Sequence, residues 1–411
     1  MSKYAGINNA EITSGQAAKL LFLFALGSAA LILPTAVTSI ARQDGWISML
    51  LAGPFNYFIL IIYLALVERF PNLSLAQYAE KVLGVWGGKL LTLLYIFFFL
   101  LLSALVLRNI SDFLNLSVLP LTPEWFIDVT FMIVIIYGVL LGIETIARTG
   151  EILFGWGMFV IVIVLFSLFN QFDLHNFEPF LFNGWQQPIK GMYPILGFPI
   201  AEFVFITAIF PLVKKQDRKK LRRSLKLSAG AITFVSTLIT VFLVGVMGVS
   251  EASRSPFAVY DMAKNINIEE VLVRVEILVA MVWIGTVFMK LVLCVYVLAV
   301  LTAQMLKLTT YRPLVVPYSF IIVPLALMVY RNAAHTQVFA MGVWTIYSLF
   351  HGFFLPLVVL VIAVIRGKKD TSDGSFPPVR ENEDADKKEQ NLAKNGSDQA
   401  DKQADKEPAP A

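Results

Sequence analysis

The sequence predicts an all-α polytopic membrane protein of about ten transmembrane helices. Of its 411 residues, 57% are hydrophobic and only 15% are charged, whereas a soluble domain averages roughly 45 to 50% and 25%. The apolar residues also form uninterrupted runs of about 20, such as 47–67 and 231–249, which is the length that a helix needs to cross hydrocarbon. The bulk of the chain therefore belongs in a lipid bilayer.

Apolar runs define a ten-helix, transporter-like membrane domain over residues 16–366. The first run starts near Ala17 and has no small-residue cleavage site after it, so it is interpreted as a membrane span and not as a cleaved signal. Residues 1–15 precede it as a short N-terminal segment. The predicted spans are 17–40, 46–67, 88–111, 125–142, 148–169, 190–213, 228–249, 271–305, 313–330 and 336–365.

The basic residues between spans set the predicted orientation. Eight Lys and Arg side chains lie between Lys214 and Lys226, beside two membrane ends, and such clusters stay in the cytoplasm. An even number of spans then places both termini in the cytoplasm. The cluster could also bind anionic lipid or a partner, but fixing the orientation is the simpler interpretation. Membrane lipid is thus an expected partner, and nothing indicates nucleic-acid binding.

The apolar signal stops after residue 366. Residues 367–411 are mostly Asp, Glu, Lys, Asn, Gln, Ala and Pro with hardly a large hydrophobe, a composition that cannot bury a core. We expect a disordered, polar cytoplasmic tail. Its acidic groups could dock a partner, although low-complexity drift is the simpler interpretation.

Helix-breaking residues mark two spans that lie five spans apart. The first span contains Gly27 among small residues and then Pro34, and the sixth contains Pro194, Gly197 and Pro199. Hydrocarbon tolerates an interrupted helix only where the freed backbone groups line a cavity or meet other protein. The sequence therefore predicts a five-plus-five inverted repeat with broken helices 1 and 6 around a cavity for a zwitterionic amino acid. The alternative is that these residues serve kinks and close packing.

Two ionisable residues lie inside the predicted spans, where a charge costs at least about 2.5 to 3.5 kcal/mol on the insertion scale. Glu202 follows Pro199 by three residues, and Lys290 lies near the middle of the long eighth span. Both are candidates for sensing ligand or protons. Glu202 could instead cap a half-helix N-terminus, and Lys290 could snorkel or pair within the bundle.

Other spans carry residues that could complete the cavity walls, although aromatic residues in membrane helices usually serve packing. The candidates are Tyr95, Phe98, Phe99, Trp283, Thr286, Phe350 and His351. A single cysteine, Cys294, excludes an internal disulfide, and three scattered histidines make no metal site. With no phosphate-binding loop, metalloprotease helix or nucleophile with a base nearby, the sequence predicts no enzyme, no cofactor and no metal.

Short motifs flank the first, eighth and ninth spans. They are Ile12-Thr13-Ser14-Gly15-Gln16, Gly27-Ser28, Gln43-Asp44-Gly45-Trp46, Arg274-Val275-Glu276 leading to Trp283-Ile284 and Lys290, and Tyr311-Arg312-Pro313 to Pro317. Over roughly residues 10–366 this pattern resembles the spore germination permease family, the B subunits of nutrient germinant receptors. That family is similar to the amino acid, polyamine and organocation transporters.

The resemblance implies ten core helices whose first and sixth segments are unwound. Carried over onto this sequence, the resemblance implies a set of ligand-binding residues, and the ionisable and aromatic candidates above extend that set. The full set is Ala25, Gly27, Ser28, Tyr95, Leu196, Gly197, Phe198, Glu202, Trp283, Thr286 and Phe350. It further implies a multi-pass protein of the spore inner membrane that binds a germinant such as an amino acid and works with receptor A and C subunits.

The predicted function is therefore an integral membrane subunit of a germinant receptor that triggers spore germination with its partners. An amino-acid secondary transporter is the alternative, because the same fold and cavity would serve both. A purely structural scaffold is a third possibility, which the paired breaks disfavour.

Overall fold

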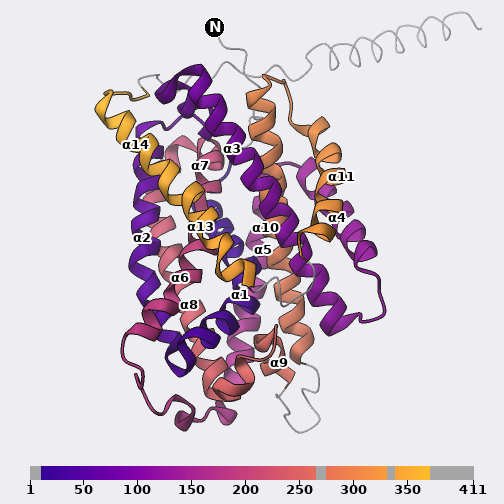
Figure 1. Cartoon of the computed structure of the whole chain (residues 1–411). Coiled ribbons are helices and arrows are strands. Elements are labelled where there is room, and N and C mark those ends of the chain that lie inside the picture. The colour runs from indigo at the N-terminus through magenta and orange to yellow at the C-terminus, as the bar shows by residue number, and fades with distance from the viewer. Residues whose placement is uncertain (1–10, 265–274, 331–337, 371–411) are drawn as a thin grey trace, which may run out of the picture.

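The computed structural model describes residues 11–264, 275–330 and 338–370, apart from the side chain of Ser28. Within these ranges the chain is helical, with turns, one isolated bridge and no strand. The helices run side by side as a bundle (Figure 1). Of the predicted N-terminal segment and C-terminal tail, residues 1–10 and 371–411 lie outside the described residues.

Each predicted span has a helical counterpart. The first half contains α1 (Ser14–Ala41), α2 (Gly45–Arg69), α3 (Leu75–Phe113), α4 (Glu124–Leu140) and α5 (Ile143–Ser167). The second half contains α6 (Gln186–Gly197), α7 (Phe205–Ile209), α8 (Arg218–Ala252), α9 (Ala258–Lys264), α10 (Val275–Met305), α11 (Arg312–Val329), α13 (Val343–Leu349) and α14 (Leu355–Ile365).

Eight helical stretches of the described chain are long and apolar enough to cross a membrane. This number is smaller than the ten predicted spans for two reasons. The short 3-10 turn Arg42–Asp44 joins the end of α1 to α2 in one stretch, and α4, at 17 residues, is too short to be included. The third predicted span also starts too late, because α3 extends back to Leu75 across a kink at Gly84, whose φ of 83° favours glycine.

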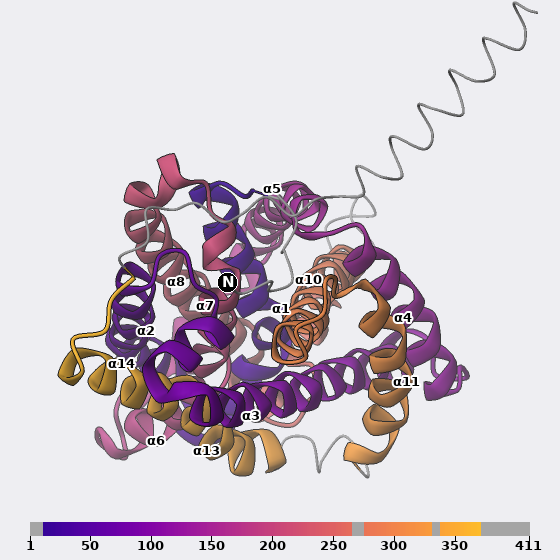
Figure 2. The same cartoon turned by 90° about the horizontal axis from the view of Figure 1, so that it is seen from above.

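Helices α1 and α10 lie in the middle of the bundle, with α4 and α11 to one side and α2, α8 and α14 to the other (Figure 2). Every residue of α10 from Met289 to Gln304 is buried. A helix that is apolar and buried all round is a central helix of a membrane bundle. Cys294 is part of this buried run.

The start of α1 is fixed by its own sequence. Thr13 and Gln16 form a capping box, in which the Thr13 hydroxyl accepts from the Gln16 backbone and the Gln16 side chain accepts from the Thr13 backbone. Ile12 forms a parallel bridge with Val213, and its N–H donates to the Leu212 carbonyl at 2.9 Å. The beginning of the first span is thereby tied to the end of the sixth.

Only one of the two predicted helix breaks is present in this conformation. The sixth span is interrupted: α6 ends at Gly197, Phe198 is extended, and a 3-10 segment, Ile200–Val204, continues to α7. The first span is not interrupted, because α1 is helical throughout Ser14–Ala41. Gly27 instead allows close packing on α10, since a Cβ there would lie 2.6 Å from the Thr286 carbonyl oxygen.

A π-helical segment, Phe350–Phe354, joins α13 to α14 and lies against the interrupted part of the sixth span. Two tyrosines from other helices bind its carbonyl groups. The Tyr63 hydroxyl donates to the Gly352 oxygen at 2.5 Å, and the Tyr95 hydroxyl donates to the His351 oxygen at 2.9 Å. Irregular backbone is thus satisfied inside the bundle, as a membrane interior requires.

Gly352→Ala is expected to destabilise the protein, because the added methyl group would collide with the Ala201 carbonyl oxygen on the interrupted span. Overpacking of this kind costs roughly 1 to 3 kcal/mol. Thermal unfolding of the purified protein in detergent should show a melting temperature lower by several degrees. Gly155→Ala, on α5, is the matched control because nothing lies within 4 Å of its added Cβ; an equal loss in both variants would contradict the close approach.

Candidate functional site

A buried ion pair lies where the interrupted sixth span meets α10. The Lys290 ammonium nitrogen lies 2.5 Å from Glu202 Oε2, and both side chains are fully buried. Glu202 is carried by the 3-10 segment that follows the interruption, and Lys290 lies on the central helix. The Trp344 indole N–H, from α13, donates to the other carboxylate oxygen, Glu202 Oε1, at 2.8 Å.

Aromatic rings enclose the ammonium group of Lys290. Its nitrogen lies 4.9 Å from the ring centre of Phe24 on α1 and 5.3 Å from that of Phe198 at the interruption. The faces of aromatic rings attract cations, more strongly when water is excluded. Lys290 therefore neither snorkels to an interface nor faces lipid; it pairs within the bundle.

Glycines bring the surrounding helices close to this centre. A Cβ at Gly27 would lie 2.8 Å from the Lys290 Cβ, so α1 passes directly beside the lysine. A Cβ at Gly197 would lie 2.5 Å from the Thr345 Cα, so the end of α6 lies directly on α13. At both predicted glycines, the lack of a side chain thus lets two segments of the bundle pack closely.

Several of the predicted ligand-binding residues lie around the ion pair or beside the π segment, whereas the Phe350 side chain is exposed. Gly27, Phe198 and Thr286 lie beside the ion pair, and Tyr95 and Gly197 contact the π segment and α13. The other predicted residues are Ala25, which is buried on α1, Leu196, which is partly buried on α6, and Ser28, whose side chain lies outside the described residues.

Phe350 lies away from the centre, because 41% of its side chain is exposed, whereas the neighbouring His351 is 3% exposed. Phe350 stacks on Phe354, at the outer surface. His351 instead faces inward, with its ring stacked on Phe98 at 5.0 Å.

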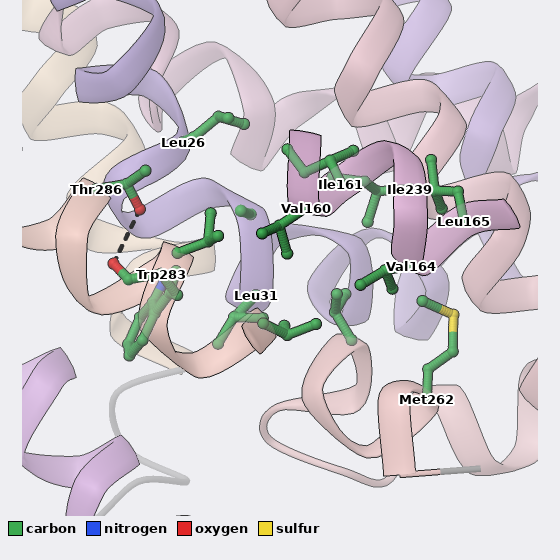
Figure 3. A pocket seen from close by; sticks show the side chains of 14 residues that line it. Leu26, Leu31, Val160, Ile161, Val164, Leu165, Ile239, Met262, Trp283 and Thr286 are labelled. Atoms are coloured by element: carbon green, nitrogen blue, oxygen red, sulfur yellow. Dashed lines mark hydrogen bonds between the residues drawn. The ribbon is translucent and has the colours of Figure 1, made fainter. Parts of the chain in front are cut away.

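Trp283 and Thr286 line an apolar cavity of about 60 Å³ between α1, α5 and α10 (Figure 3). Leu26, Leu31 and Val160 also contribute to its walls, and Met262 of α9 closes one side. The Thr286 hydroxyl donates to the Trp283 carbonyl at 2.9 Å, so its polar group is satisfied within its own helix. A volume of this kind would hold roughly four waters, but the apolar walls suit a hydrocarbon group.

A smaller cavity of about 20 Å³ lies on the other side of the carboxylate. Its lining includes Glu202, Trp344, Tyr330 and Asn109, and Asn109 Oδ1 is buried without a hydrogen-bond partner among the described residues. This space is enough for about one water molecule. The centre is therefore closed in this conformation, with no room for an amino acid between the charged groups.

Trp344 and Phe24 contact the ion pair, but the sequence does not indicate them as site residues. Each lies in an apolar run and shows no sequence feature that separates it from packing or interfacial aromatic residues. The sequence marks Lys290 as an ionisable residue in a span, but only the structure shows its partner. Within residues 11–264, 275–330 and 338–370 no cluster of three or more His, Cys, Asp or Glu side chains could hold a metal ion.

Comparison with known proteins relates the chain to spore germination. Residues 11–336 match the family model described as "Spore germination protein". The chain is similar to spore germination protein KB of Bacillus subtilis (strain 168), with 29% identity covering 88% of this chain and 97% of that protein. Spore germination protein YndE of the same organism is 25% identical, covering 72% of this chain and 82% of the relative.

Solved structures with a similar fold include transporters. MhsT in complex with L-phenylalanine has a TM-score of 0.59 and 15% identity, covering 84% of this chain and 97% of that one. Mhp1, a nucleobase-cation-symport-1 family transporter, has a TM-score of 0.58 and 11% identity, covering 89% and 94%. At such low identity the likeness shows the fold alone. Together with the apolar helices, these matches identify a transporter-like multi-pass membrane protein and not an enzyme class.

The ion pair predicts a specific pattern of stabilities. Glu202→Gln or Lys290→Met alone leaves one buried charge without its partner and should destabilise the protein by about 3 to 5 kcal/mol. The double substitution removes both charges and should recover most of that loss. Denaturant unfolding in detergent measures all three variants. If the double variant instead lost as much unfolding free energy as the two single variants together, the two groups would not interact.

The half-exposed pair Lys19–Glu151, at 2.8 Å between α1 and α5, supplies the matched control. Lys19→Met and Glu151→Gln should each change the unfolding free energy by less than about 1 kcal/mol, because solvent screens the two charges.

Proposed function

The chain belongs to the spore germination protein family, and on that premise we propose that it is the membrane-embedded, ligand-binding subunit of a nutrient germinant receptor. Its ligand is an amino acid, bound where the interrupted sixth span meets α1 and α10. Binding shifts the subunit between two conformations, and partner subunits of the receptor A and C type respond to that shift. The complex lies in the spore inner membrane.

The buried Glu202–Lys290 pair is the observation that carries this proposal. Ionisable groups are rare inside membrane helices and mark the places where ligands, ions or protons are handled. Here the two charges lie beside an interrupted helix, the place at which transporter-like folds bind their substrates. A carboxylate and an ammonium group side by side also match the two charges of an amino acid.

A receptor function requires that the ligand prefer one of two states of the protein. The closed centre described above is one such state, because the charged groups contact each other directly and leave space for about one water molecule. A second state must open to admit the ligand. The difference in ligand affinity between the two is the free energy available to act on partner subunits.

The basic cluster supports cytoplasmic termini. In the structure its residues from Arg218 to Lys226 form the first turns of α8, and the exposed Arg222 lies 3.6 Å from Glu68 near the end of α2. Positively charged helix ends remain on the cytoplasmic side. Both described ends of the chain lie on this same side of the bundle (Figure 1).

An amino-acid permease is the second candidate, favoured by the fold shared with MhsT and Mhp1. The two functions differ in the step after ligand binding. A permease must open its centre alternately to each side of the membrane, whereas a receptor subunit only needs two states that partners distinguish.

Spores that lack this chain are expected to lose germination toward one class of amino acid while germinating normally with other nutrients. Release of dipicolinate measures the response across a panel of single amino acids and sugars, and restoring the gene is the control. Uptake of the same amino acid by growing cells should be unchanged. Normal germination with lost uptake would instead establish a permease.

A further inference from the structure

We propose that the Glu202–Lys290 pair is an internal substitute for the ligand, which binds by separating the two side chains. The ligand's ammonium group takes the place of Lys290 at Glu202, and its carboxylate takes the place of Glu202 at Lys290. The ligand class is an α-amino acid with an uncharged, apolar side chain. This inference rests on the proposed function and specifies how its site distinguishes ligands.

Charge compensation favours an exchange with a zwitterion. Both side chains are fully buried, and a charge left unpaired in such surroundings costs several kcal/mol. A zwitterion inserted between them leaves every charge paired, so the pair can separate without that loss. An amine alone would leave Lys290 without a counter-charge, and a carboxylic acid alone would do the same to Glu202. The pair therefore selects for ligands that carry both groups.

The surroundings can hold the separated groups. Trp344 donates to Oε1 while Lys290 contacts Oε2, so Glu202 stays oriented when Oε2 changes its partner. The rings of Phe24 and Phe198 present their faces to the ammonium group and would attract a ligand ammonium in the same position. Lys290 itself can withdraw, because its side chain is a flexible four-carbon chain.

An apolar cavity is available for the side chain of the ligand. The cavity in Figure 3 begins one helical turn from Lys290, at Thr286, and Leu26, next to Gly27, also lines it. Its volume of about 60 Å³ suits a small hydrocarbon group, and its walls offer no charge to compensate a charged side chain. An aliphatic amino acid held at the ion pair could therefore place its side chain here.

Three probes with the same isopropyl group test the charge requirement. L-valine, isobutylamine and 3-methylbutanoate share the branched side chain, but only L-valine carries both charges. Calorimetric titration of the purified protein, repeated with L-alanine, L-leucine and L-isoleucine, should show binding of at least one amino acid and none by the amine or the acid at tenfold higher concentration. Comparable binding by either single-charge probe, or no binding by any of the four amino acids, would overturn the inference.

The double variant Glu202→Gln/Lys290→Met separates a role in binding from a role in stability. It keeps the centre free of unpaired charge but offers no charge to a zwitterion. Its dissociation constant for the amino acid that binds the wild type should rise by at least about a hundredfold, because two hydrogen bonds to charged groups are lost. Wild-type affinity in the double variant would mean that the pair is only structural. Lys19→Met/Glu151→Gln is the control and should bind as the wild type does.

Filling the cavity tests where the side chain binds. Val160→Trp, in the cavity wall on α5, should abolish binding of the aliphatic amino acids. Val162→Trp, on the same helix with 61% of its side chain exposed, should leave binding unchanged. Equal affinity of the two variants for the amino acid would mean that the cavity is not part of the binding site.

The outcomes also separate this inference from the proposed function. If the double variant binds normally while spores lacking the chain fail to germinate with that amino acid, the exchange is wrong and the receptor role stands. If the wild type binds no amino acid and such spores germinate normally, both are wrong.

Discussion

The ion pair between Glu202 and Lys290 is the interaction around which the centre of the bundle is organised. Two fully buried charges can persist only if each is satisfied, and here four segments supply the partners. The sixth span provides the carboxylate and α10 the ammonium group, while α13 donates a hydrogen bond through Trp344 and α1 contributes the ring of Phe24. The charge pair thereby couples segments that are far apart in the sequence.

Irregular backbone makes this geometry possible. The carboxylate reaches Lys290 because the α-helix of the sixth span ends at Gly197 and Glu202 lies on the 3-10 segment Ile200–Val204 that precedes α7. The π segment on the facing span comes so close that Gly352 has no room for a side chain against Ala201. In hydrocarbon such backbone is stable only when its polar groups find partners, which Tyr63 and Tyr95 provide for two of the carbonyls.

Much of the fold can be predicted from the sequence, because crossing hydrocarbon imposes long apolar helices. The sixth-span break and the buried carboxylate are also predictable, since Pro194, Gly197 and Pro199 lie within six residues and a charge inside a span is rare. Gly27 is ambiguous: glycine permits either an unwound segment or close packing, and the neighbouring backbone of α10 decides for packing. Phe350 cannot be placed from the sequence, because the apolar run does not show which side of this span faces inward; in the structure Phe350 is exposed and His351 is buried.

Stability alone gives no reason to keep charges in this position. Replacing a buried ion pair by apolar side chains of similar volume is often neutral or stabilising, and the walls around this pair are already apolar and aromatic. What an apolar centre would lack is a pair of opposite charges that can change partners without leaving either one exposed to hydrocarbon. In the proposed exchange the closed state is stable in the absence of ligand, yet it opens to a molecule that carries the same two charges. The proposed receptor subunit needs both properties, and an ion pair at an interrupted helix would supply them together.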